Sequence, residues 1–405
     1  MDTAAAYRAP GRASSSPRLI SQTATGRLNR VRLLQLLYDV GPASRAELAR
    51  LAEVTKTTIG SIVQPMIDAG ILVEREPRQS SVFGGKPARP IWLSPLGRPI
   101  VAVHVGPGSV RAALVSLTGT IRSHSSARFS GTRSSQRSII DTIAACVEDV
   151  LPGNEKPLGV GVAVGGMVDT DRGHIVAVNL APRLSGLALG PLLSRRLGLP
   201  VQLDLHPRVQ ALGDRWFGLG RGVSSFASVY CGEAIGAEFV IDGTVHRGAS
   251  GAGGEVGHTV VDLGGAVCRC GRRGCWETIA THTWLRQAAA AAQLPGARSL
   301  TAGGLLALAE AGSKDADELL NRYARNIAVG LVNLQQTLAP DLFILHGDIV
   351  QAGEVFRALI EQAVYSGIAP RPGGEPEIIF AKPEDDMALL GAAGLVLSES
   401  LDQLA

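Results

Sequence analysis

The sequence predicts an α/β protein with a small helical module at the amino terminus, followed by two related α/β lobes. Its 405 residues exceed the roughly 100–200 residues of one typical domain. Hydrophobic residues make up 45% of the chain and charged residues 19%, which supplies a packed core and excludes wholesale disorder. A pattern of strand, glycine turn and strand occurs at residues 100–121 and again at residues 226–245. This internal repeat predicts the two lobes.

The amino-terminal module follows a stretch, residues 1–25, that is rich in Ala, Ser and Arg. It has little to bury, and we expect a flexible arm there. Apolar residues at steps of three then predict a first helix, and they are Leu28, Val31, Leu34 and Leu37. Gly41-Pro42 is a typical signal for the end of such a helix.

Two capping patterns predict the second and third helices of the module. Ser44 precedes Glu47 by three residues, which is the capping-box pattern and predicts a short helix through Leu51. Thr55 can cap a third helix over residues 56–69. Pro65 within that helix allows a kink or a shorter helix.

Two short strands, residues 71–74 and 90–93, flank a glycine-rich basic loop and complete the pattern of a winged helix-turn-helix over residues 26–98. In such a module the start of the third helix lies in the major groove of double-stranded DNA, and basic side chains of the wing lie near phosphates. The candidate DNA contacts are Lys56, Thr57, Thr58, Ser61 and Gln64 on the helix, with Lys86 and Arg89 in the wing. A three-helix protein-interaction domain is the alternative.

The charge of the chain is unevenly distributed and favours DNA as the partner of the module. Residues 1–98 contain 14 Lys and Arg against 7 Asp and Glu, a net charge of +7. The remaining residues contain 25 against 29, a net charge of −4, which gives +3 for the whole chain. No window of about 18 apolar residues and no secretory signal occurs, so we expect a cytoplasmic protein without a membrane segment.

The repeated lobes predict a cleft between them, which is a natural place for a ligand. The equivalent positions of the repeat are Gly106 and Gly232, residues 112–115 and 238–241, and Gly119 and Gly243. Glycine turns after strands can hold phosphates through backbone N–H groups, but they are also common in hairpins.

A cysteine cluster is the strongest chemical signal of the sequence. The five cysteines are odd in number and three lie within eight positions, which favours metal binding in a reducing compartment over disulfides. One imidazole and three thiolates suit tetrahedral, structural Zn²⁺, and the candidate ligands are His258, Cys268, Cys270 and Cys275. Chance clustering and a redox site are the alternatives.

Residues 254–258 (GEVGH) and the C-x-C-G-x-x-G-C-x-E motif at residues 268–277 resemble the signature of the ROK family (repressor, open reading frame, kinase). The winged helix resembles that of the family's transcriptional-repressor branch, which includes xylose and N-acetylglucosamine repressors. The resemblance implies a two-lobed, actin-like (ribonuclease H-like) sugar-kinase fold. It also implies a homodimer or homotetramer and a sugar or sugar-derivative effector that changes DNA affinity.

This resemblance implies a small lobe over residues 99–212 and a large lobe with the zinc motif over residues 213–405, whose carboxy-terminal helix packs back on the small lobe. The four candidate zinc ligands match those of the family. The family's contacts to sugar hydroxyls match Glu255, His258 and Glu277.

The phosphate-handling side departs from the family pattern at four places. His104 replaces the Asp of the first phosphate turn, which removes the anionic anchor of magnesium. Asp204-Leu205-His206 stands where the family has Glu-Asn-Asp, whose Asp is the catalytic base. Glu233 puts negative charge in the second phosphate turn, and His346-Gly347-Asp348 replaces a Gly-Gly-Gly. We therefore expect no catalytic residues and no phosphoryl transfer.

The resulting expectation is a DNA-binding repressor of carbohydrate-related genes whose sugar-responsive lobes are catalytically degenerate. One alternative is an active ATP-dependent sugar kinase with an appended DNA-binding domain. Another is a regulator with a non-sugar effector or none, because Leu205 and His206 alter the pocket. The remaining histidines and cysteines are expected to be surface or core residues, and they are His124, His174, His246, His282, Cys146 and Cys231.

Overall fold

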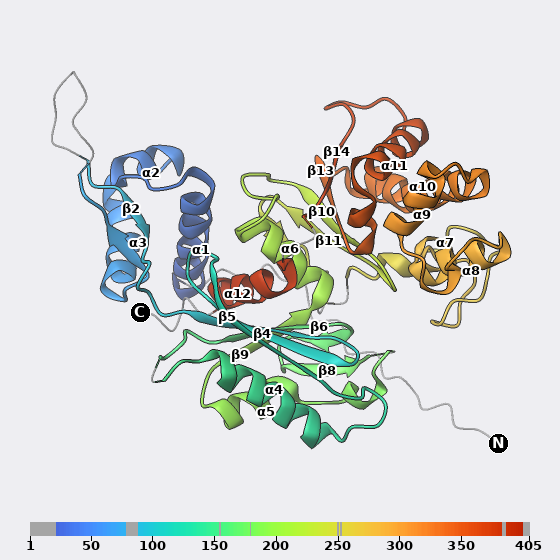
Figure 1. The fold of residues 1–405 in the computed structure, drawn as a ribbon. Helices are drawn as coiled ribbons and strands as arrows, with labels where there is room; N and C mark the ends of the chain where they lie inside the picture. Colours follow the sequence, from blue (N-terminus) through green and yellow to red (C-terminus); the bar gives the residue numbers. More distant parts are fainter. Residues whose placement is uncertain are drawn as a thin grey trace, which may run out of the picture.

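The computed structural model describes residues 22–77, 88–153, 155–178, 180–248, 251, 253–382 and 386–399. Three helices and a two-stranded antiparallel sheet form the amino-terminal module, drawn in blue in Figure 1. Their bounds are α1 (Gln22–Val40), α2 (Arg45–Leu51), α3 (Lys56–Asp68), β1 (Leu72–Glu74) and β2 (Ile91–Leu93). Helix α1 begins within the predicted arm, whose residues 1–21 lie outside the described part.

Local capping forms the module's helices as the sequence predicts. The Ser44 side chain accepts the Glu47 backbone N–H at 3.3 Å, and the Glu47 carboxylate accepts the Ser44 N–H at 2.7 Å, so the capping box is complete. The Thr55 hydroxyl accepts the N–H of Thr58 at the start of α3. The helix continues through Pro65 to Asp68 rather than ending early.

The first lobe contains a five-stranded sheet in the order β5-β4-β3-β6-β9, in which the first three strands pair antiparallel and the last two continue in parallel. Its strands are β3 (Ile100–Val105), β4 (Ser109–Val115), β5 (Ile121–Arg128), β6 (Val160–Val164) and β9 (Val201–Leu205). A hairpin, β7 (Met167–Asp169) and β8 (His174–Ala177), and the helices α4 (Gln136–Val150), α5 (Leu189–Leu197) and α6 (His206–Trp216) complete it.

The second lobe repeats this topology in the sheet β12-β11-β10-β13-β14. Its strands are β10 (Phe226–Cys231), β11 (Ile235–Ile241), β12 (Thr244–Val245), β13 (Leu342–His346) and β14 (Glu377–Phe380). Its helices are α7 (Glu277–Ala280), α8 (His282–Ala291), α9 (Ala302–Glu310), α10 (Lys314–Leu338) and α11 (Gly353–Gly367). The matching strand orders confirm that residues 100–121 and 226–245 are equivalent hairpins of two related lobes.

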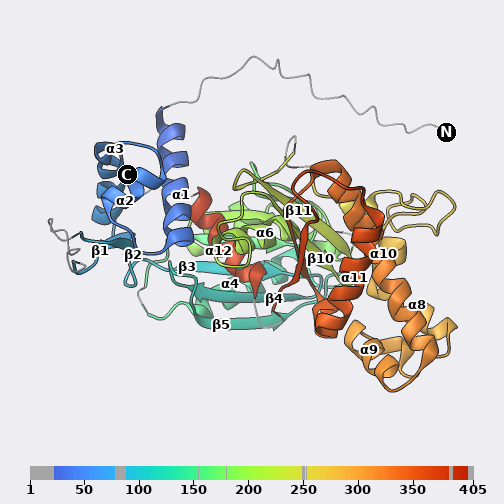
Figure 2. The same cartoon turned by 90° about the horizontal axis from the view of Figure 1, so that it is seen from above.

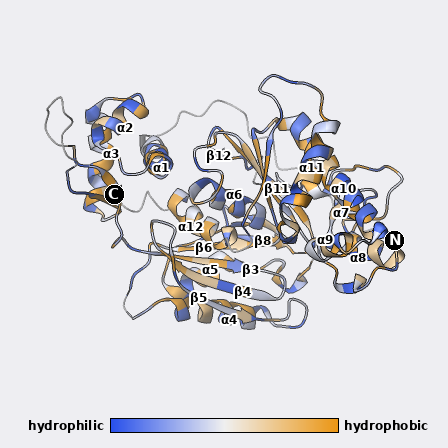
Figure 3. Cartoon of the chain, turned by 45° about the horizontal axis from the view of Figure 1, so that its top comes forward, coloured by the Kyte–Doolittle hydropathy of each residue, from blue (hydrophilic) through white to orange (hydrophobic). Residues whose placement is uncertain are grey.

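Both faces of the first sheet are covered, because side chains alternate along each strand. Along β3, Val101, Val103 and Val105 pack with α4 and α5, whereas Ile100 and Ala102 face a second core. That second core includes α12 (Met387–Glu399), which packs along α6 and against β3 and β6. Figure 3 shows the hydrophobic residues of the central strands between the more polar outer helices.

The module shares this second core with the first lobe. Leu34 and Leu37 of α1 belong to the same buried cluster as residues of α12 and β3. Figures 1 and 2 both place α1 between the other module helices and α12. Tyr38 of α1 also packs edge-on against Trp216 and Phe217, with ring centroids 5.4 Å apart in each pair. The module is therefore packed on the lobe that carries α6.

Candidate functional site

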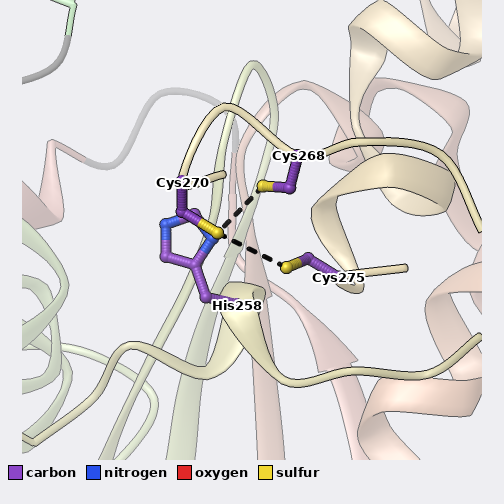
Figure 4. A group of neighbouring side chains, drawn as sticks. All are labelled: His258, Cys268, Cys270 and Cys275. Atoms are coloured by element: carbon purple, nitrogen blue, oxygen red, sulfur yellow. Dashed lines mark hydrogen bonds between the residues drawn. The ribbon is translucent and has the colours of Figure 1, made fainter. Parts of the chain in front are cut away.

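Four side chains of the second lobe converge on one point, as Figure 4 shows. The ligand atoms of His258, Cys268, Cys270 and Cys275 all lie within 4.8 Å of one another. His258 Nδ1 lies 3.5 Å from the sulfur of Cys268, and the sulfurs of Cys270 and Cys275 are 3.6 Å apart. His258 ends a single 3-10 turn, Val256–His258, and the cysteines come from the loop that leads to α7.

The backbone of the cysteine loop depends on Gly274, which has a φ of 67°. A Cβ at this position would lie 1.5 Å from the carbonyl oxygen of Asp262, so only glycine fits. Isolated antiparallel bridges join Val260 to Cys275 and Val267 to Arg273. The turn and these bridges bring the three thiols to one side of the loop.

The donor set fits a tetrahedral Zn²⁺ ion. Zn–S bonds of about 2.3 Å separate neighbouring ligand atoms of a tetrahedron by about 3.8 Å. The separations of 3.5 and 3.6 Å in the cluster are close to that value. Without a cation the thiols hold protons unequally, because hydrogen bonding to Arg272 lowers the pKa of Cys270 to about 6 while burial raises that of Cys275 to about 12. A bound cation deprotonates its thiol ligands.

A cleft of about 560 Å³ lies beside the cluster and is lined by Glu255, His258 and Glu277. His258 turns its Nδ1 to the sulfurs and its Nε2 to Glu255, whose carboxylate oxygen is 3.9 Å away. An ion held by Nδ1 therefore leaves Nε2 directed into the cleft. Glu255 is exposed, whereas the side chain of Glu277 is only 7% exposed. The structure thus brings together the three predicted hydroxyl contacts.

Two hydrogen bonds orient Glu277. Its Oε1 atom accepts the backbone N–H of Ile235 at 3.1 Å and an Arg269 guanidinium N–H at 2.8 Å. Arg269 lies between two of the candidate metal ligands and lines the cleft, but the sequence reasoning did not assign it a role. Its position inside the C-x-C motif was the signal that could have found it.

The opposite wall of the cleft carries the positions at which the sequence departs from the kinase pattern. His104 of β3 and His206 of α6 stack with ring centroids 4.8 Å apart, and Tyr230 meets His206 edge-on at 5.4 Å. Burial lowers the pKa of His206 to about 4 and lowers that of His104 well below its usual value. Both imidazoles are therefore neutral near pH 7.

The charged groups on this wall, and Glu233 beside the cysteine loop, are already paired. Arg111 donates to His104 Nδ1 at 2.9 Å and forms an ion pair with Asp386. Glu233 pairs with Arg286 at 2.6 Å. Its second carboxylate oxygen accepts the Thr283 hydroxyl at 3.3 Å.

His346, in the fourth departure from the family pattern, also has a partner. Its Nε2 lies 2.8 Å from Asp214 of α6, and both side chains are buried. Asp348 comes within 2.9 Å of Nδ1 of the buried His282. These contacts pair His346 and Asp348 with side chains of α6 and α8.

A buried ion cluster lies beneath the cleft, and nothing in the sequence pattern indicated it. Arg208 has no exposed surface, and it donates to Asp204 at 2.6 Å and to Glu238 at 3.1 Å. It also donates to the carbonyl oxygen of Gly251 at 3.0 Å, in the segment that leads to Glu255. Burial raises the pKa of Glu238 to about 7, although Arg208 opposes that rise.

The candidate DNA contacts lie at the start and along the outer face of α3. Lys56, Thr57, Ser61 and Gln64 are exposed, whereas Thr58 is half-buried and its hydroxyl lies 2.9 Å from that of Thr55. Gln64 donates to Asp68 at 2.8 Å. Arg89 is exposed beside Glu74, and Lys86 lies outside the described residues.

The remaining histidines and cysteines lie on the surface or in the core, as the sequence predicts. His124 and His246 are exposed, His174 is half-buried, and Cys146 and Cys231 are buried. Among the described residues, no helix combines the length and the apolar character needed to cross a bilayer.

Comparison with known proteins identifies the lobes. The profile of the ROK family matches residues 100–399. A xylose repressor of Caldicellulosiruptor bescii is 25% identical over 94% of this chain and 98% of its own length. A glucokinase of Thermotoga maritima is 28% identical over 73% of this chain and 96% of its own length.

A solved structure shares the fold along almost the whole chain. It is the crystal structure of a ROK family transcriptional regulator, a homologue of the MLC protein of E. coli, with a TM-score of 0.78. It is 23% identical and covers 94% of this chain and 98% of that chain. The family match spans both lobes, the cysteine cluster and the cleft, and the chain therefore belongs to the ROK family.

Proposed function

We propose that the chain is a DNA-binding transcriptional repressor of carbohydrate-related genes, with a sugar bound in the cleft as its effector. One observation carries this proposal: the described lining of the cleft holds Glu255, His258 and Glu277, with His104 and His206 at positions where the family's kinases have acidic residues. The xylose repressor matches the chain including its amino-terminal module, whereas the glucokinase matches 73% of it, which also supports a regulator.

The amino-terminal module would act as a winged helix-turn-helix. Its third helix presents Lys56, Thr57, Ser61 and Gln64 to solvent, and these side chains suit phosphates and base edges. Arg89 extends the basic surface at the base of the wing. The first 98 residues carry a net charge of +7, which favours a polyanionic partner.

The cysteine cluster would hold a structural zinc ion through His258 and the three thiolates. All four positions of a tetrahedral shell are then filled by protein, which leaves no open position for catalysis. The ion would fix the loop that carries Arg269 and would orient the His258 ring toward the cleft. A preoriented site spends less free energy on ordering when a ligand binds.

Helix α6 would transmit ligand binding to the module. Its first residue, His206, lines the cleft, and its third residue, Arg208, holds the segment before Glu255. At its other end Arg215 makes two hydrogen bonds to Asp39 of α1, at 2.8 and 2.9 Å. A ligand that favours one arrangement of the lobes can change DNA affinity only by its differential affinity for the two arrangements, typically about 1–3 kcal/mol.

A second ionic path would support the same coupling. Arg247 lies 3.3 Å from Asp204 of the buried cluster and 3.3 Å from Glu399 of α12. Glu399 in turn lies 3.3 Å from Arg27 of α1. This chain of charges joins the cleft's supporting cluster to the first helix of the module.

The test begins with an operator, obtained by sequencing the genomic fragments that the full chain retains. Lys56→Ala should weaken binding of every sequence and reduce the salt slope of log K by about one, because one phosphate contact is lost. Lys314→Ala, an exposed lysine at the start of α10, is the matched control. An unchanged affinity and slope in Lys56→Ala and Gln64→Ala would exclude α3 as the reading helix.

The same operator complex tests the effector. A panel of monosaccharides and amino sugars is titrated while operator release is followed, and magnesium-ATP is added in a parallel assay of ADP formation. We expect release by at least one sugar without ADP formation. Sugar-dependent turnover of about 1 per second or faster would establish a kinase instead.

A further inference from the structure

The half of the cleft that faces away from the cysteine cluster has surroundings unlike a phosphate site. The rings of His104 and His206 stack on each other, Tyr230 packs edge-on against His206, and all three side chains line the cleft. Leu205 and Met167 add apolar surface to the lining of the same cleft. Leu180, which also lines it, is 50% exposed, so its side chain is accessible to a ligand.

The charges near this surface offer little to an anion. Arg111 is engaged by Asp386 and by His104, so its guanidinium is not free for a phosphate. Glu233 adds a carboxylate at the rim of the cleft. Burial keeps His104 and His206 neutral near pH 7, so neither ring supplies a positive charge.

The size of the cleft leads to the same conclusion. A volume of about 560 Å³ falls in the range of sites that enclose drug-sized ligands, which are larger than one sugar ring. The candidate hydroxyl contacts occupy one end, where Glu255 and Glu277 offer acceptor carboxylates and His258 offers its Nε2–H as a donor. A single sugar bound there leaves the aromatic and apolar end without a ligand group.

We infer that the effector is a sugar joined to an aromatic group, either an aryl glycoside or an aromatic ester of a sugar. This inference rests on the proposed sugar-responsive function and names the class of ligand for the same cleft. The sugar hydroxyls bind Glu255, His258 and Glu277. The aromatic ring packs among the His206, Tyr230 and Leu180 side chains, where edge-to-face contact and apolar burial stabilise it.

The experiment measures dissociation constants of the full chain by calorimetry. Probes are glucose, methyl glucoside, phenyl glucoside, 6-O-benzoylglucose and glucose 6-phosphate, with the methyl and phenyl glycosides of xylose as a second pair. The two aromatic positions allow for either orientation of the sugar. We expect at least one aromatic conjugate to bind about tenfold tighter than its unsubstituted or methyl counterpart. Operator release should follow the same ranking.

Two variants locate the effect. Leu180→Ser should reduce the ratio between the aromatic and methyl ligands toward one, because the aromatic ring loses apolar contact. Val176→Ser is the matched control, since Val176 is 54% exposed on β8 and does not line the cleft. Leu180 is half-exposed, so its replacement leaves the fold intact.

Three results would overturn the inference. Equal affinity for methyl and aromatic conjugates overturns only the inference of an aromatic group, and the proposed sugar-responsive function then stands. Tightest binding of glucose 6-phosphate also overturns it alone, because the far end then takes an anion. If no sugar, substituted or not, binds or releases the operator, the proposed effector function fails and this inference fails with it.

Discussion

The two walls of the cleft differ in how closely their residues match the pattern of the family's kinases. The wall beside the cysteine cluster carries two carboxylates and an imidazole, all directed at the cavity. The opposite wall has the neutral His104 and His206 side chains and the Arg111–Asp386 pair at positions that depart from the kinase pattern. On the proposed function, the cleft would bind sugar hydroxyls without the charges that phosphoryl transfer needs.

The two walls can change independently because different elements build them. The hydroxyl-binding wall comes from the turn at His258 and the cysteine loop, whose shape depends on a local cluster. The phosphate wall comes from the ends of β3 and β9 and the start of α6. Substitution at His206 therefore leaves the geometry of His258 untouched.

The largest expected effect breaks the hydroxyl-binding wall. Cys268→Ser should lower bound zinc from about one per chain to near zero, because three remaining ligands hold the ion weakly. Loss of the ion should also release the cysteine loop and abolish the sugar response. Metal content by emission spectroscopy checks the change.

Cys146→Ala is the control for this variant, since Cys146 is buried in α4 far along the chain from the cluster. It should retain its zinc. Equal zinc in wild type and Cys268→Ser would exclude the cluster as the metal site.

The next largest effect concerns the buried guanidinium group of Arg208, which supports both walls of the cleft. Arg208→Met leaves Asp204 and Glu238 buried without their partner, and we expect a loss of about 3–5 kcal/mol in the free energy of unfolding. Urea denaturation measures it. Arg196→Met, which removes a surface ion pair with Glu148, should cost less than about 1 kcal/mol. Similar losses in both variants would contradict a special role for Arg208.

The same cluster predicts a pH dependence. Glu238 has a pKa of about 7 in the folded chain and an ordinary value of 4.5, so the folded chain binds more protons between those values. The free energy of unfolding contributed by this carboxyl therefore falls as pH rises from about 4.5 to 7. Arg208→Met should raise the pKa of Glu238 further and extend that fall to higher pH, because the opposing positive charge is gone. A flat profile over this window in the variant would contradict the assignment.

A smaller effect is expected from replacing either of two glutamates that line the cleft, Glu255 and Glu233. Glu255→Gln should weaken the sugar response by about tenfold, because a charged hydrogen-bond acceptor is lost. Glu233→Gln should change it little, since Glu233 is engaged by Arg286 and Thr283. Operator release titrations measure both variants. An equal loss of sugar response in the two variants would mean that Glu233 contributes to sugar binding as much as Glu255 does.

The smallest effect is expected from restoring the acidic residue that the family's kinases have at the position of His206. His206→Asp should leave sugar-dependent ADP formation at background, because His104, Glu233 and His346 still depart from the phosphate-handling pattern. Zinc content and sugar binding confirm that the variant is folded. Turnover in this variant would show that one residue separates the two functions.

Local features of the site and module were predictable from sequence because their residues are close along the chain. The capping box at Ser44 and Glu47 spans three residues and formed as expected. The strand repeat also predicted equivalent hairpins in two sheets. The four cluster residues occupy 18 positions from His258 to Cys275, so a short loop can bring them together.

Contacts between distant segments were decided only by the tertiary structure. Arg215 and Asp39 are 176 positions apart, and Arg208 and Glu238 are 30 apart on different elements. Neither periodicity nor a motif predicts such a pair, because in the sequence each of these residues is indistinguishable from a charged residue on the surface. Their burial depends on how α6 packs between the two sheets, α1 and α12. The amino-acid sequence determined the capped helices, the repeated strands and the metal-binding residue types, whereas packing over long distances decided which charges were buried and paired.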